Sequence, residues 1–239
     1  VEFVCHKIDI PALARESGKG VEECARDERY RVLEEERIAR GFDAIAVAHN
    51  ADDNVESVIF NLVRGSGANG IAGIRAVNGK IIRPLILATK KEILDYCEKN
   101  GVEYVTDSTN ANTDYTRNYI RHEIVPALVR LNPSLAQSVA RLGATLRQDE
   151  ELIEQMAQSF ILEHCPNGYI YPERIAQCHD SVKARVFKAL SGENLDFKSI
   201  NACVDFIPRS KCGELINLCK GISLKRESDH LVFIKTTDL

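Results

Sequence analysis

The sequence has no apolar run long enough to cross a membrane. A spanning helix needs roughly 20 consecutive, mostly apolar residues, and charged residues, which make up 28% of the chain, interrupt every hydrophobic stretch before that length. The N-terminus also lacks the charged, apolar and small-residue regions of a secretory signal. These absences predict a cytoplasmic protein without membrane contact.

The chain lacks a C-x-x-C pair, although it has eight cysteines. The tightest spacings, Cys203 to Cys212 and Cys212 to Cys219, do not match the ligand spacing of zinc sites. We therefore expect buried or incidental thiols rather than a metal site or a disulfide framework.

An excess of charge of one sign is also missing, since the net charge is -4 over 239 residues. This excludes compositional disorder and a globally basic surface. Contacts with nucleic acid would have to come from local basic segments such as "TRNYIRH" and "SVKARVFK". With 44% hydrophobic residues and no internal repeat, the chain is long enough for two unequal domains.

The first half alternates between strand-like and helix-like patterns. Apolar runs without polar alternation are typical of parallel strands buried on both faces. Thr89 and Glu92 are the start signals of a helix, and Gly101 is its stop signal. We predict strands over 1–10, 42–49 and 80–87, and helices over 21–40, 52–64 and 90–100. This order predicts an α/β fold with a parallel, Rossmann-like sheet.

After about residue 118 the pattern becomes mainly helical. Asn132 and Pro133 signal the start of a helix of about 30 residues, long enough to connect two domains. Two shorter helices over 172–191 and 196–207 and a two-stranded hairpin within 214–235 complete the prediction. We place the domains at 1–130 and 131–239, the second being a small α+β tRNA- or substrate-binding domain.

Acidic residues gather where the strand 42–49 turns into the next helix. Ligands of open α/β sheets bind at the carboxyl ends of strands, beside helix N-termini. Asp53 and Glu56 are three residues apart and Asp52 and Glu56 are four apart, so either pair can share one helix face beside His49. The alternative is that these acids have only a structural role, because acids in a first helical turn also stabilise the helix through its dipole.

The segment "AHNADDNVESVIFNLVRGSGANGIAGI" resembles the H-H-x-x-D-x-x-E-T, R-G-S-G and G-L-x-G elements of the tRNA(Ile)-lysidine synthases, members of the PP-loop ATP pyrophosphatase superfamily. Further matches are "VEECARDERYRVL" to E-x-x-A-R-x-x-R-Y, "IIRPLI" to R-P-L-L, and "DSTN" with "RNYIR" to D-S-[TS]-N and R-N-x-[IL]-R. The resemblance is continuous over about 1–148.

The resemblance implies site residues, each of which also has a structural alternative such as a turn cap or a solvated helix face. The catalytic residues it implies are His49, Asp53 and Glu56. The ATP-binding residues are His49, Arg64, Gly65 and Gly67. The residues for lysine and tRNA are Glu22, Arg26, Arg29, Arg83, Asp107, Asn110, Arg117, Asn118 and Arg121. The metal ligands stay unassigned.

The reaction that the resemblance implies uses ATP and Mg²⁺ and joins free L-lysine to the wobble cytidine of tRNA(Ile) with a CAU anticodon. Phosphoryl chemistry of this kind needs charge compensation and alignment. We hypothesise that Asp53 places Mg²⁺ or orients the nucleophile, and that Glu56 contacts the lysine ammonium or accepts a proton. Arg64 or Arg117 would oppose the phosphate charge. Assembly as a homodimer is left open.

The sequence departs from the family pattern at Asn50, at Asn54 (where glutamine is common) and at Ser57 (where threonine is usual), and in one missing element. Asn50 stands where the second histidine is usual, so a role that needs an imidazole falls to His49. The phosphate-binding S-G-G-x-D-S loop of the superfamily does not occur in the 239 residues, so we expect the chain to be an N-terminally incomplete fragment. The alternatives are another PP-loop tRNA-modifying enzyme of the thiolase type, and a tRNA-binding fragment without catalysis.

Overall fold

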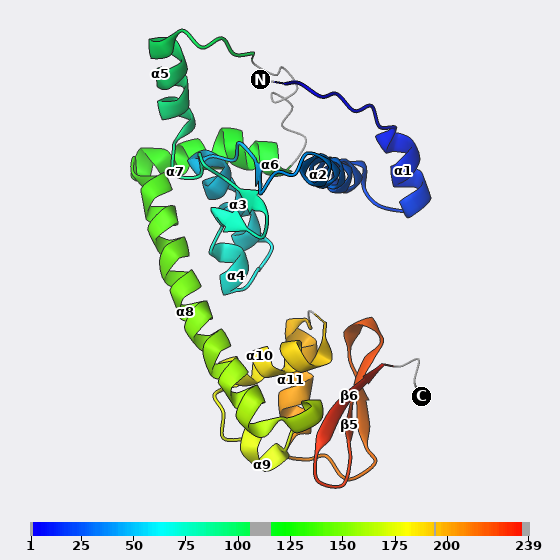
Figure 1. The fold of residues 1–239 in the computed structure, drawn as a ribbon. Helices are drawn as coiled ribbons and strands as arrows, with labels where there is room; N and C mark the ends of the chain where they lie inside the picture. The colour runs from blue at the N-terminus through cyan, green and yellow to red at the C-terminus, as the bar shows by residue number, and fades with distance from the viewer. Residues whose placement is uncertain (1, 106–115, 194, 236–239) are drawn as a thin grey trace. The chain divides into compact units, whose positions relative to one another are not determined.

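The structure is a computed structural model that describes residues 2–105, 116–193 and 195–235 (Figure 1). The chain divides into two compact units, Val1–Gly143 and Ala144–Leu239. The division lies within one long helix, and the domain boundary predicted at residue 130 stays a prediction. None of the helices described is long and apolar enough to cross a membrane.

The first unit combines helices with a small three-stranded sheet. Strands β1 (Ile45–Ala46), β2 (Val77–Asn78) and β3 (Ile81–Ile82) pair in the order β1-β3-β2. β1 is parallel to β3, with Ile45 opposite Ile81, and β2 is antiparallel to β3. The helices are α1 (Ile10–Ser17), α2 (Val21–Ala39), α3 (Ala51–Val63), α4 (Ala68–Ile71), α5 (Lys90–Asn100), α6 (Thr116–Tyr119) and α7 (Val125–Leu131).

The strand predicted over residues 1–10 is wrong. Residues 2–9 form no strand, and Ile10 begins α1. The physical reason is local: the Asp9 side chain accepts a hydrogen bond from the amide of Ala12, and Pro11 favours a first helical turn. The sequence "DIP" contained that helix signal.

The predicted strands 42–49 and 80–87 are present but short. β1 is buried only at Ile45, while Ala46 is exposed, so the prediction of a strand buried on both faces is wrong. β3 ends at Ile82 because the residues around Pro84 form turns, in which the amide of Ile86 bonds the carbonyl of Arg83. β2 was missed, although the Asn78-Gly79 turn is a strong hairpin signal.

The predicted helices of the first unit are confirmed. α5 has Thr89 as N-cap, a capping box with Glu92, and Gly101 in the left-handed conformation at its end. α3 begins one residue before the predicted Asp52, because Asn50 is its cap. Val55 and Val58 of α3 pack against Val139, with Ile59 and Val125 beside them, and form the core of this unit.

A π-helical turn, Ile120–Ile124, lies between α6 and α7. Pro126 has no backbone N–H and so cannot donate to the carbonyl of His122, four residues before it. The amide of Val125 instead bonds the carbonyl of Ile120, five residues back. Single π-helical turns are frequent at functional sites, and this one carries Arg121.

The second unit packs helices against a three-stranded sheet. The predicted 30-residue helix is confirmed as α8 (Leu135–His164), but its predicted start is wrong: α8 begins at Leu135 and not at Pro133, and Asn132 is the C-cap of α7. The helix predicted over 172–191 is two helices, because His179 caps a new start through Nδ1. The remaining elements are α9 (Pro172–Ile175), α10 (Asp180–Ser191), α11 (Phe197–Phe206), β4 (Leu215–Asn217), β5 (Ile222–Arg226) and β6 (Leu231–Lys235). β4 adds a third strand to the predicted hairpin.

The core of the second unit is formed by fully buried side chains from these helices and strands and from Ile170, an isolated bridge residue that pairs with Leu231. Phe187, Ile170 and Leu224 are its centre. Cys203 is also buried there, and burial raises the pKa of its thiol to about 12. All eight cysteines are free.

Candidate functional site

The parallel strands β1 and β3 end at the same edge of the sheet, and the predicted site residues follow them. His49 and Asn50 come after β1, and Arg83 comes directly after β3. Asn50 forms a capping box with Asp53: each side chain accepts a hydrogen bond from the other residue's amide, at 3.0 Å. This fixes the first turn of α3 at the carboxyl edge of the strands, where α/β proteins bind ligands.

Three charged side chains meet beside this turn. Arg121 donates from Nε to Oε1 of Glu56 (2.6 Å) and from Nη2 to Oε2 of Glu56 (2.8 Å). The same Nη2 also reaches Oδ1 of Asp53, at 3.2 Å. Glu56 is only 3% exposed, so its charge is compensated by a bidentate guanidinium pair rather than by water.

Arg117 lies one helical turn before Arg121 and approaches the same carboxylate. Its Nε is 3.7 Å from Oε2 of Glu56. The guanidinium of Arg117 is half exposed and has no shorter ion pair among the described residues. The structure thus brings together residues 53–56 and 117–121, which the sequence could only place on separate segments (Figure 1).

His49 is held neutral by its surroundings. Burial lowers the pKa of its imidazole below the usual value, and the positive charges of Arg83, Arg117 and Arg26 lower it further, while Asp53 acts in the opposite direction. These contributions place three arginines from three different segments within electrostatic reach of His49. His49 therefore lies among charges of both signs, the carboxylate of Asp53 and the three guanidinium groups.

Two polar atoms at this site lack hydrogen-bond partners. Nδ1 of His49 and Nε of Arg83 are the buried side-chain nitrogen or oxygen atoms without a partner in the part of the chain that the structure describes. Arg83 is held at its other end, since its Nη1 donates to the carbonyl of Arg75 at 2.8 Å. Buried polar atoms are normally paired, so both fit contact with a polar ligand.

Asp52 makes a different contact from Asp53. Its Oδ2 accepts from the amide of Lys90, the first residue of α5, at 2.6 Å. Arg121 therefore joins Asp53 with Glu56, whereas Asp52 bonds the backbone of α5. Asp52 connects the start of α5 to the first turn of α3.

The glycine-rich segment lies at the other end of α3. Arg64 and Gly65 follow the last residue of this 13-residue helix, roughly 20 Å from its start at 1.5 Å per residue. The guanidinium of Arg64 lies over the Phe60 ring, 5.0 Å from its centroid, and Gly67 caps α4. The structure does not bring these predicted ATP-binding residues to His49, and their role stays a prediction.

The other predicted residues are distributed over α2, α6 and the undescribed segment. Glu22 and Arg29 are exposed on α2, and Asn118 lies in α6. Asp107 and Asn110 lie outside the described residues.

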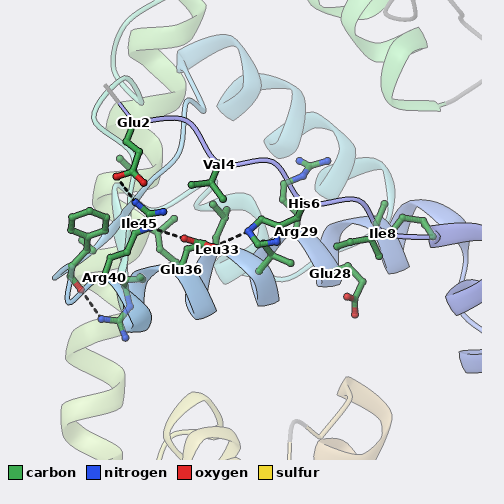
Figure 2. Close-up of a pocket in the computed structure, with 17 residues that line it drawn as sticks. Glu2, Val4, His6, Ile8, Glu28, Arg29, Leu33, Glu36, Arg40 and Ile45 are labelled. Atoms are coloured by element: carbon green, nitrogen blue, oxygen red, sulfur yellow. Dashed lines mark hydrogen bonds and ion pairs between the residues drawn. The ribbon is translucent and has the colours of Figure 1, made fainter.

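A groove of about 820 Å³ lies between residues 2–10, α2 and β1 (Figure 2). Alternate residues of the N-terminal segment face it, among them Val4 and Ile8, and Arg29 is the predicted site residue in its wall. A hydrogen bond between His6 and Glu36 and an ion pair of Glu2 with Arg40 hold the segment along α2. Because alternate residues of the segment face the groove, the sequence pattern of residues 1–10 predicted a strand.

The arrangement does not form a metal site by itself. Among the described residues no three histidine, cysteine, aspartate or glutamate side chains are grouped so that they could hold a metal ion. Both oxygens of Glu56 accept from Arg121, and those of Asp53 accept from Arg121 and from the Asn50 amide. We therefore assign no chemical step to Mg²⁺.

Comparison with known proteins gives consistent matches. A family model described as a PP-loop domain matches residues 1–128. The tRNA(Ile)-lysidine synthase of Thermotoga maritima is 39% identical over 167 residues, which cover 70% of this chain and 40% of the relative. That of Parabacteroides distasonis is 42% identical over 154 residues (64% and 35%), and that of Persephonella marina is 31% identical over 245 residues (100% and 53%). The chain thus spans about half the length of these relatives or less.

Proposed function

The chain belongs to the PP-loop domain family, and from this membership and the site at α3 we propose that the protein is a tRNA(Ile)-lysidine synthase acting in the cytoplasm. In this reaction O2 of the wobble cytidine attacks the α-phosphate of ATP and pyrophosphate leaves. The ε-amine of free L-lysine then attacks C2, and AMP leaves. The product, lysidine, changes the codon read from AUG to AUA.

One observation carries the proposal: the two unpartnered buried atoms, Nδ1 of His49 and Nε of Arg83, belong to residues within electrostatic reach of each other at the carboxyl edge of the strands. Arginine side chains beside a helix N-terminus favour a phosphate group. The phosphates of ATP and of the wobble nucleotide are the anions of the proposed reaction. Mg²⁺ would accompany the ATP phosphates.

We assign each residue of the site the role that its contacts favour. Arg117 lies beside His49 and opposes phosphate charge in preference to Arg64, which follows the far end of α3. Glu56 is a positioning residue, because both its oxygens hold Arg121. Asp53, whose side chain is 21% exposed, is the carboxylate accessible to the lysine amine.

The test is product formation. The protein is incubated with ATP, Mg²⁺, lysine and tRNA(Ile) with a CAU anticodon, and lysidine is scored by mass spectrometry. Lysidine is the expected product. Thiolated nucleoside would favour a thiolase-type PP-loop enzyme, and bound but unmodified tRNA would favour a binding fragment; either result contradicts the proposal.

Glu56→Gln tests the positioning role. Neutralising Glu56 weakens its hold on Arg121, and we expect turnover to fall by roughly 100-fold, as misplacement of a reacting group typically does. The matched control is Glu123→Gln. Glu123 is an exposed acid in the π-helical turn that carries Arg121, and this variant should keep wild-type turnover. Unchanged turnover in Glu56→Gln would show that the assignment is wrong.

A further inference from the structure

The second unit has a cavity of its own. It has a volume of about 430 Å³ and is lined by the end of α8, by α9 and by the turn that follows: Phe160, His164, Glu173, Arg174, Gln177 and Cys178. Small-ligand sites occupy about 300–1,000 Å³. None of these residues belongs to the site at α3 or to the matched family segment 1–128.

One wall of the cavity is aromatic and is joined to an arginine. The rings of Phe160 and His164 pack edge to face, with centroids 4.9 Å apart. Nη1 of Arg174 lies 3.2 Å from Nδ1 of His164. Since the guanidinium can only donate, Nδ1 of His164 is the acceptor in this contact.

The remaining wall offers polar groups with little net charge. The amide nitrogen of Gln177 donates to the carbonyl of Glu173 at 3.1 Å, which leaves the Gln177 carbonyl oxygen as an acceptor. Burial raises the pKa of the Cys178 thiol, so this side chain is a neutral part of the wall. One guanidinium and one carboxylate balance each other, which disfavours an isolated phosphate.

We propose that this cavity binds an unstacked nucleobase of the tRNA, a proposal that rests on the proposed function for its source of RNA. A nucleobase is flat and uncharged, and its edge carries both donors and acceptors. Proteins bind such bases by stacking them on aromatic or guanidinium planes and by bonding their edges. Phe160, His164 and Arg174 supply planes, while Glu173 and Gln177 supply edge contacts.

The first measurement uses free nucleosides and needs no enzyme activity. Adenosine, guanosine, cytidine and uridine are titrated separately into the chain, and the NMR signals of the Arg174 and Gln177 side chains are followed. We expect one nucleoside to shift both signals, and unlabelled tRNA to reverse the shift. If no nucleoside shifts them, or if tRNA leaves the bound nucleoside in place, the proposal is wrong.

The second measurement compares tRNA affinity in variants. We expect Arg174→Ala to weaken tRNA binding about fivefold or more, the loss expected for one stacked base, and Gln177→Ala to weaken it through the loss of an edge contact. Arg209→Ala removes the same charge from another exposed position of this unit and should have a smaller effect. Equal effects of Arg174→Ala and Arg209→Ala would show that Arg174 contributes only its charge to tRNA affinity, and would overturn the proposal.

The two proposals fail in different ways. Nucleoside shifts in the second unit without lysidine formation would contradict the proposed function and leave the cavity assignment standing. Lysidine formation without nucleoside shifts would support the proposed function and contradict the cavity assignment.

Discussion

At the scale of single residues, adjacent side chains of α3 have separate tasks. Asp53 accepts from Arg121, while Asp52 accepts from the backbone of α5. Asn54 points to a third partner: its Oδ1 accepts from the amide of Ile74 at 2.7 Å. One helical turn therefore organises three neighbouring segments, because successive side chains of a helix point about 100° apart.

The titration of His49 tests the surroundings of its imidazole. The unfolded value is about 6.5, and burial lowers the folded pKa below it. Between the two values the unfolded chain holds a proton that the folded chain does not, so the stability contributed by neutral His49 is present above about pH 6.5 and is lost as the pH falls below it. NMR titration should give a midpoint below 6.5, and added inorganic phosphate should raise it. A midpoint above 6.5 without phosphate would contradict this.

Gly73 should be the less replaceable of two glycines with similar backbones. Gly65 has φ +73° and Gly73 has φ +75°, where a side chain costs about 1–2 kcal/mol. A Cβ at Gly73 would lie 2.3 Å from Oδ1 of Asn54, whereas one at Gly65 would meet open space. We expect Gly73→Ala to destabilise the protein by about 3 kcal/mol, since it also breaks the bond to Ile74, and Gly65→Ala by about 1 kcal/mol. Urea unfolding measures both; equal losses would contradict the prediction.

At the scale of elements, short contacts between segments hold the site together. The π-helical turn presents Arg121 to α3, and Asp52 of α3 binds the first amide of α5. The amide of Ala51 also bonds the carbonyl of Ala88, just before α5. The starts of α3 and α5 are therefore joined by two hydrogen bonds, so that a change at one helix start affects the other.

Removing the Asp52 contact should loosen the start of α5. Asp52→Ala leaves the Lys90 amide without its partner, and we expect a loss of about 1 kcal/mol, as for a helix cap. Hydrogen exchange of the first α5 amides should become faster. Asp95→Ala, an exposed acid on the same helix, is the control. Unchanged exchange in Asp52→Ala would show that Thr89 and Glu92 alone are sufficient to hold the start of α5.

At the scale of the whole molecule, each unit has a core of its own. Val55 is 2% exposed in the core of the first unit, and Val186 is 0% exposed in that of the second. Separate cores are the physical basis of units that open independently.

Paired core substitutions test this independence. Val55→Ala and Val186→Ala should each cost about 2 kcal/mol through lost burial and a cavity. We expect hydrogen exchange to become faster only in the unit that carries the substitution. Faster exchange in both units after either substitution would indicate one cooperative core.

Local chemistry in the sequence determined the helices. Thr89, Glu92 and Gly101 mark both ends of α5, and apolar spacing predicted all 30 residues of α8, because caps and helical periodicity depend on residues only a few positions apart. The motifs likewise located the turn from His49 to Glu56 and the arginines at 117 and 121. Strands were predicted less well: residues 2–9 have an alternating pattern but no partner strand.

Only the tertiary structure decided which charges meet. Two acidic pairs were compatible with helical spacing, and Arg121, 65 residues from Glu56, selects Asp53 with Glu56. The unpartnered atoms of His49 and Arg83 and the cavity beside Arg174 are likewise properties of segments distant in sequence. Periodicity specifies which face of an element a side chain occupies. The partner on that face depends on long-range packing, which no local pattern contains.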